Sequence, residues 1–161
     1  MIIRLAKAAD IPGMLKLLRQ VGDVHHRIRP DIFRAGALKY DEPSLRELLR
    51  QEDRPIFIAE QDGAVAGYCF CVRKDFRGSS VQADRAEFYI DDLCVEETLR
   101  GTGIAKALFA HVKAYAKERG YHSVTLNVWC GNHSAMAFYE KQGLKMRNIM
   151  MELRLEDEEC C

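Results

Sequence analysis

The segment Arg100-Gly101-Thr102-Gly103-Ile104-Ala105 joins an apolar, strand-like run to a long amphipathic helix pattern. Glycine readily adopts positive φ, and the missing Cβ lets the backbone approach a ligand closely. The first N–H groups of the helix that follows have no partner within the helix, so they point toward an anion at that end. This turn therefore predicts a phosphate-binding site between a strand and a helix.

The sequence on either side of the turn predicts an α/β fold. Residues 86–95 have a strand pattern, and the apolar positions of residues 104–116 lie on one face of a helix that Gly120 ends. Residues 124–128 alternate between apolar and polar positions, as a strand does. Together these elements should form a right-handed crossover between two parallel strands, with the turn at the carboxyl end of the first.

The remaining segments predict further strands and helices in the same domain. Asp10 is an N-cap for a first helix that Gly22 should end, and Asp62-Gly63 has the residues of a tight hairpin turn. The strands and helices are expected at residues 2–5, 11–21, 43–50, 56–60, 64–74 and 134–142, with two antiparallel strands in residues 144–155. We predict a single domain over residues 1–155, followed by an acidic, disordered tail over residues 156–161.

Composition narrows the classes of partner. The 161 residues include 24 basic and 24 acidic side chains, so no basic field favours nucleic acid or an anionic membrane. Residues 1–7 have charges within their apolar stretch, which is atypical of a secretion signal, and no apolar run is long enough to span a bilayer. These features predict a cytoplasmic protein.

The cysteines predict neither disulfides nor a metal site. Four of the cysteines lie within apolar or strand-like patterns: Cys69, Cys71, Cys94 and Cys130. A domain of this size does not need disulfide bonds for stability. Their spacing to other cysteines and histidines does not match that of metal ligands. We expect reduced side chains and no bound metal.

The turn lacks the features of the commonest nucleotide-binding motifs. A dinucleotide site has a third glycine where this chain has Lys106, and an acidic residue near the end of the second strand, where residues 126–129 have none. The Gly-Lys-Ser/Thr of a P-loop is also absent. Dinucleotides and nucleoside triphosphates are therefore disfavoured.

Three segments resemble the GNAT superfamily of acetyl-CoA-dependent N-acetyltransferases. Arg100, Gly103 and Ala105 match the family's pyrophosphate turn, and residues 132–144 match its Asn, Phe-Tyr and Gly-apolar pattern. Residues 88–95 are similar to the fourth strand of diamine acetyltransferases. The resemblance covers residues 2–155 and implies a mixed α/β sheet of about seven mostly antiparallel strands with a central parallel pair, and four helices.

The resemblance implies a set of cofactor contacts and catalytic groups. The Val95 N–H would polarise the thioester carbonyl, and the phenol of Tyr139 would protonate the departing CoA thiolate. An aromatic side chain that only packs beside Phe138 is the alternative for Tyr139. The expected acetyl-CoA contacts are the backbone of Leu93, Cys94 and Val95, the turn residues Arg100, Gly101, Thr102, Gly103, Ile104, Ala105 and Lys106, and Asn132, Ser134, Phe138 and Tyr139.

The acceptor side rests on two adjacent carboxylates. Asp91 and Asp92 are unusual in a strand, and because neighbours face opposite sides, one should face the acceptor cleft. Asp91 is the first candidate to hold an amine and relay its proton, Glu87 is a further base, and structural pairing of both aspartates stays open. His25, His26 and Arg29 fall where the family builds its acceptor pocket, although a solvated loop is the default interpretation.

We therefore expect an enzyme that transfers an acetyl group from acetyl-CoA to a primary amine by direct attack. Covalent transfer through Cys94 is disfavoured because no basic partner adjoins it in the sequence. A non-catalytic acyl-CoA sensor and an acetyltransferase for protein N-termini are the alternatives. The oligomeric state stays open, although a homodimer through the C-terminal strands is common among similar proteins.

Overall fold

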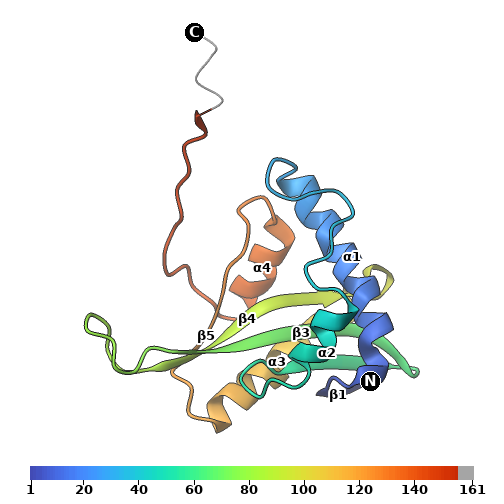
Figure 1. The fold of residues 1–161 in the computed structure, drawn as a ribbon, viewed down its shortest axis with the longest axis horizontal. Coiled ribbons are helices and arrows are strands. Elements are labelled where there is room, and N and C mark those ends of the chain that lie inside the picture. Colours follow the sequence, from blue (N-terminus) through green and yellow to red (C-terminus); the bar gives the residue numbers. More distant parts are fainter. Residues whose placement is uncertain (156–161) are drawn as a thin grey trace.

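The computed structural model describes residues 1–155 and contains one five-stranded sheet in the order β1-β2-β3-β4-β5 (Figure 1). The first four strands pair antiparallel, and β4 and β5 pair parallel. The elements are β1 (Ile2–Leu5), α1 (Ile11–Ile28), α2 (Glu42–Leu48), β2 (Ile56–Gln61), β3 (Ala64–Asp75), β4 (Ala86–Val95), α3 (Ile104–Glu118), β5 (Ser123–Leu126) and α4 (His133–Lys141), with short 3-10 turns at Ala8–Asp10 and Glu97–Leu99. The mixed α/β fold and its parallel pair are confirmed.

Two apolar layers sandwich the sheet. On one face α3 packs through Leu108, Phe109 and Val112 against β-strand residues such as Phe88 and Ile90. On the other face α1 and α2 bury a second cluster that includes Met14, Leu17, Leu45, Tyr68 and Phe70. We refer to these as the α3 face and the α1 face of the sheet.

The hairpin prediction is confirmed. Asp62 has φ 52° and Gly63 has φ 77°, so both central residues of the β2–β3 turn adopt the positive φ that a two-residue hairpin requires. Strands β1 and β4 also have the bounds expected from the sequence.

The first helix does not end at Gly22. Helix α1 continues to Ile28 and includes His25 and His26 in its last turn. A Cβ on Gly22 would lie 2.8 Å from the carbonyl oxygen of Ala37, so this glycine allows close packing of the loop after α1. The sequence-based end was wrong because a packing glycine was interpreted as a stop signal.

The expected last two strands are absent from the described residues. After α4 the chain runs away from the body of the molecule in an irregular course, with no strand in residues 144–155 (Figure 1). Six large apolar side chains there are mostly exposed: Met146, Ile149, Met150, Met151, Leu153 and Leu155. The predicted tail over residues 156–161 lies outside the described residues.

Within residues 1–155, no helix combines the length and apolar character needed to cross a lipid bilayer.

Candidate functional site

The glycine turn forms an open cradle before α3. Gly101 has φ 80° and Gly103 has φ 93°, and a Cβ on either would meet no atom within 4 Å. Thr102 Oγ1 donates to Leu99 O at 2.6 Å and tightens the turn, while the N–H of Ala107 donates to Gly103 O at 3.0 Å. The N–H groups of residues 104–106 precede that bond, so the helix leaves them for an anion.

Charges beside the turn suit an anionic ligand. Glu96 pairs with Lys16 on α1, which neutralises the carboxylate that follows β4. Arg100 lies 3.8 Å from Glu97, and its side chain is 48% exposed, so it can turn toward a phosphate. Lys106 is also exposed.

The carboxyl half of β4 has one free edge. Strand β5 pairs with β4 only from Glu87 to Ile90, so residues 91–95 have no strand partner on that side. The N–H of Glu96 donates to Ala66 O at 2.9 Å on the β3 side. Because backbone groups alternate along a strand, the N–H groups of Leu93 and Val95 point to the free edge.

The free edge of β4 ends a few residues before the glycine turn, with the 3-10 turn Glu97–Leu99 between them. It offers a main-chain surface to which an extended ligand can pair as an added strand does. Gln20 of α1 already donates through Nε2 to Val95 O at 2.9 Å, which leaves the Val95 N–H as the donor at the end of the edge.

A β-bulge places both aspartates on the α1 face. Phe70 of β3 pairs with Asp92 and the next residue, Cys71, pairs with Ile90, so Asp91 is an extra residue in β4. Tyr40 donates to Asp91 Oδ2 at 2.9 Å, and Tyr68 donates to Asp92 Oδ2 at 3.0 Å. The expectation that the two carboxylates face opposite sides was wrong because a bulge interrupts the alternation.

The two tyrosines that donate to these carboxylates both pack against Phe70. Phe70 stacks with Tyr40 at 5.6 Å between ring centroids and meets the Tyr68 ring edge-on at 4.8 Å. Burial raises the pKa of Asp92 to about 6, against the opposing charge of Lys39 and the Tyr68 hydroxyl. Burial and the Asp91 carboxylate raise the pKa of Tyr40 to about 12, so its hydroxyl stays a donor.

Asp91 is held by the loop between α1 and α2. Lys39 Nζ lies 2.8 Å from Asp91 Oδ2 and donates to the Asp91 carbonyl oxygen at 3.1 Å. Leu38 and Tyr40, on either side of Lys39, both pack against the core of the α1 face. Sequence reasoning missed Lys39 and Tyr40, because the loop containing them has no apolar period and only the fold brings it to β4.

Helix α4 supplies the remaining family-type residues. Asn132 caps it by accepting from the Ala135 N–H at 3.2 Å, and Ser134 Oγ donates to the same oxygen at 3.2 Å. Tyr139 packs against Phe138, with ring centroids 5.1 Å apart, and against the core of the α3 face. Burial raises the pKa of Tyr139 well above its ordinary value, so the phenol keeps its proton.

Cys94 is a packed thiol. Its Sγ accepts from Gln20 Nε2 at 3.2 Å and lies 3.6 Å from Leu17 O on α1. Burial raises the pKa of this thiol to about 12, which suppresses the thiolate that covalent transfer would need.

Glu87 lies apart from the group around Asp91. It is the second residue of β4, four residues before Asp91, which corresponds to about 13 Å along a strand. Arg85 and Arg147 each approach its carboxylate to 2.8 Å. Burial opposes the ionised form, but the two guanidinium groups outweigh it and hold the pKa of Glu87 below its ordinary value, which does not suit a proton acceptor.

The three predicted acceptor-pocket residues have structural partners. His26 Nδ1 lies 2.6 Å from Phe33 O, and Arg29 pairs with Asp31 and Glu152. His25 packs against Phe33 with ring centroids 5.0 Å apart, and burial and the charge of Lys39 lower its pKa.

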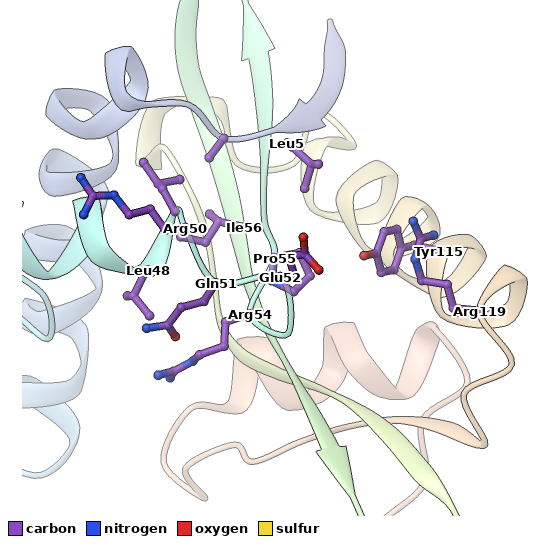
Figure 2. Close-up of a pocket in the computed structure, with 12 residues that line it drawn as sticks. Leu5, Leu48, Arg50, Gln51, Glu52, Arg54, Pro55, Ile56, Tyr115 and Arg119 are labelled. Carbon is purple, nitrogen blue, oxygen red and sulfur yellow. The ribbon is translucent and has the colours of Figure 1, made fainter.

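One surface hollow lies away from the glycine turn and the aspartates. Its volume is about 420 Å³, and its lining includes Leu48, Ile56, Tyr115 and Arg119 (Figure 2). Tyr115 and Arg119 mark the carboxyl end of α3, whereas the glycine turn is at the amino end of this 15-residue helix, about 22 Å away. None of the predicted site residues lines this hollow.

No cluster of three or more His, Cys, Asp or Glu side chains within residues 1–155 is arranged to hold a metal ion.

Comparison with known families agrees with this geometry, because the acetyltransferase (GNAT) family matches residues 23–144. The chain belongs to the GNAT acetyltransferase family. The matched range includes the free edge of β4, the glycine turn and α4.

Individual relatives extend the comparison. The chain is 29% identical over 103 residues to an uncharacterized N-acetyltransferase of Methanocaldococcus jannaschii, a match covering 64% of this chain and 44% of that protein. It is 28% identical over 103 residues to a putative [ribosomal protein bS18]-alanine N-acetyltransferase of Bacillus subtilis, with 64% and 62% covered. The chain thus spans about half of the length of these two relatives.

Solved structures show the same fold. A mutant of the BH1408 protein from Bacillus halodurans superposes with a TM-score of 0.92 at 29% identity, covering 96% of this chain and 99% of that one. An aminoglycoside N-acetyltransferase in complex with CoA superposes with a TM-score of 0.68 at 18% identity, covering 95% and 99%, a likeness of fold alone.

Proposed function

We propose that this protein transfers the acetyl group of acetyl-CoA to a primary amine by direct attack. The observation that carries the proposal is the free edge of β4, which runs from the acidic bulge at Asp91 to the glycine turn before α3. A thioester paired along that edge has an anion cradle at one end and a carboxylate for a cationic amine at the other.

The turn and the strand edge supply the donor side. The amides of Gly101 to Lys106, with Arg100, bind the pyrophosphate, and the backbone of Leu93 to Val95 pairs with the pantetheine arm. The Val95 N–H then donates to the carbonyl oxygen as it becomes an oxyanion, an effect typically worth about 3 kcal/mol per donor. Gln20 supports this geometry by fixing the carbonyl group of the same residue.

The aspartate group and α4 supply proton transfers. Asp91 binds the ammonium form of the acceptor and passes its proton to solvent, after which the neutral amine attacks the thioester carbon. Tyr139 keeps its proton at neutral pH, as its raised pKa requires, and gives it to the departing thiolate. In this proposal His25 and Asp92 also contact the acceptor.

The α-amino group of a peptide is the second candidate acceptor. The Bacillus subtilis relative, a putative [ribosomal protein bS18]-alanine N-acetyltransferase, favours it. The two acceptor classes differ in the charge around the reacting amine, and the adjacent carboxylates of Asp91 and Asp92 favour acceptors with a second cationic group. A cytoplasmic location stays a prediction.

A panel of amines tests the proposal. Release of free CoA thiol is followed with a polyamine, an aminoglycoside and a peptide with N-terminal alanine, each at several concentrations. We expect turnover with at least one primary amine and tight binding of acetyl-CoA by calorimetry. Binding of acetyl-CoA without turnover on any amine would instead identify a non-catalytic sensor.

We further propose that a second copy of the chain covers residues 144–155. Ile149, Met151, Leu153 and Leu155 alternate with polar or less apolar positions, so in a strand they would share one face. They are 70%, 91%, 74% and 75% exposed. The outer edge of β5 has no strand beside it in the described residues, and it is where such a segment would pair.

A further inference from the structure

The amine that Asp91 holds in this structure belongs to the chain itself. Lys39 Nζ lies 2.8 Å from the Asp91 carboxylate and also donates to the Asp91 carbonyl oxygen at 3.1 Å. Its ε-amino group is a primary alkyl amine, the class of acceptor proposed above. Lys39 therefore occupies the position in which Asp91 would bind the substrate amine.

The fold holds Lys39 in that position from both sides. The packing contact between Gly22 and Ala37 brings the loop close to α1, and Leu38 packs into the core of the α1 face. Tyr40 stacks on Phe70 and shares Asp91 Oδ2 with Lys39, at 2.9 Å from its hydroxyl. The ion pair is thus the end of an anchored loop, in contrast to a pair between two freely rotating surface chains.

The Lys39 side chain keeps the freedom that a reacting group needs. It is 41% exposed, whereas Asp91 is 19% exposed. Leu93, whose N–H points to the free edge of β4, is two residues beyond Asp91, about 7 Å along the strand. A flexible four-carbon stem can move its amine over a distance of this order.

We propose that Lys39 is an acceptor for the acetyl group, so that the protein acetylates its own acceptor loop in cis. The proposal rests on the function proposed above, because it uses the same donor, the same strand edge and the same carboxylate. Lys39 Nζ forms a bond to the acetyl carbon as the carbon–sulfur bond of acetyl-CoA breaks. Of the two protons that the ammonium loses, one leaves with CoA as its thiol and the other passes through Asp91 to solvent.

Acetylation of Lys39 would change the site. The amide product has no charge, so the ion pair to Asp91 is lost and the carboxylate is free for an external cation. The unmodified chain should therefore bind a cationic acceptor more weakly than the acetylated one. The first acetyl group transferred would prepare the site for later acceptors.

The test is acetylation of the purified protein without any added amine. The full chain is incubated with acetyl-CoA, and peptide mass spectrometry follows the acetyl group on each lysine over time. We expect Lys39 to gain one acetyl group much faster than Lys113, which is exposed on α3 and reports the chemical background. Because the reaction is intramolecular, its rate constant should not change when the protein is diluted tenfold.

Two variants with the same conservative change separate this reaction from a structural role of Lys39. Lys39→Arg keeps the positive charge beside Asp91 but lacks the reactive amine, so the rapid acetylation should vanish, and external cationic amines should be acetylated with the higher KM expected of the unmodified chain. Lys113→Arg should leave the rapid step unchanged. A third variant, Lys39→Met, should lower KM for a cationic acceptor severalfold with little change in kcat.

The possible outcomes distinguish the two proposals. If external amines are acetylated while Lys39 and Lys113 are labelled at equal rates, the self-acetylation is overturned and the acetyltransferase function stands. If acetyl-CoA labels Lys39 at a rate that rises with protein concentration, transfer occurs between chains and the cis proposal fails. If neither an external amine nor Lys39 is acetylated, both proposals are wrong.

Discussion

At the scale of single residues, position within the strand gives the two adjacent carboxylates, Asp91 and Asp92, different surroundings. Asp91 lies in the bulge with two donors, Lys39 and Tyr40, and the Lys39 side chain is 41% exposed, so an external cation could take its place. Asp92 pairs in the ladder with Phe70 and accepts from the core residue Tyr68. The first carboxylate is thus available to a ligand, and the second belongs to the packing.

Tyr139→Phe should separate binding from chemistry. Loss of a general acid commonly costs about 10²- to 10⁴-fold in rate, and the phenylalanine ring preserves the packing against Phe138. We expect kcat to fall by that order while calorimetry gives an unchanged affinity for acetyl-CoA. A variant with full activity would remove Tyr139 from the mechanism.

Asp92→Asn should stabilise the protein at neutral pH. The pKa of Asp92 is about 6 in the folded state against 3.8 for the ordinary side chain, so the folded state retains a proton that the unfolded state has released. Stability from this group therefore falls as pH rises from about 4 to about 6 and stays lower above that, by at most about 3 kcal/mol. Asparagine has no such penalty and keeps an oxygen for the Tyr68 hydroxyl.

Urea unfolding at several pH values measures this effect. The advantage of Asp92→Asn over the natural chain should be large at pH 7 and disappear near pH 4. Asp62→Asn, in the exposed hairpin turn, is the matched control and should show no comparable trend. An advantage that is equal at both pH values would contradict a buried, titrating carboxylate.

At the scale of elements, α1 contains a glycine that allows a tertiary contact and does not end the helix. Gly22 lies within the helix, and its missing Cβ admits the Ala37 carbonyl of the loop that follows. Replacement of an interior helical glycine by alanine normally gains about 1 kcal/mol, whereas overpacking costs about 1–3 kcal/mol. We therefore expect Gly22→Ala to lower stability.

Thermal unfolding checks this balance. Gly22→Ala should melt below the natural chain, because the added methyl group pushes the loop away from α1. Asp23→Ala, at the adjacent exposed position, is the control and should melt at the same temperature or slightly higher. A Gly22→Ala variant with a higher melting temperature than the natural chain would mean that the loop can shift to admit the methyl group without loss of stability.

Elements with strong local signals were predictable, and those set by contacts were not. The hairpin at Asp62-Gly63, strand β4 and the start of α3 follow from turn chemistry and periodicity, and the structure confirms them. The bulge at Asp91 and the approach of Lys39 have no local signature, since each depends on two segments that meet only in the fold. The glycine turn and the strand before it could therefore be placed in advance, whereas the contacts around Asp91 could not.

At the scale of the whole molecule, the C-terminal segment is notable because a single chain leaves its apolar side chains exposed to water. Residues 144–155 expose large apolar side chains over a continuous stretch, and such a surface commonly marks an interface. We expect light scattering to show a dimer at micromolar concentration. The double variant Ile149→Ser with Leu153→Ser should shift it to a monomer.

Met150→Ser is the matched control for that experiment. Met150 is 93% exposed but lies on the opposite face of the alternating pattern, so its replacement should leave the dimer intact. A natural chain that stays monomeric at these concentrations would refute the proposed interface.

The bulge in β4 also bears on how this fold can change its substrate over evolution. A residue that has no opposite number in the ladder can be exchanged without altering the pairing of its neighbours, and Asp91 is such a residue. If Asp91 binds the acceptor as proposed, new side chains at this one position would change the acceptor while the strand edge proposed for the donor keeps its register. Variation in specificity is thereby uncoupled from the integrity of the sheet.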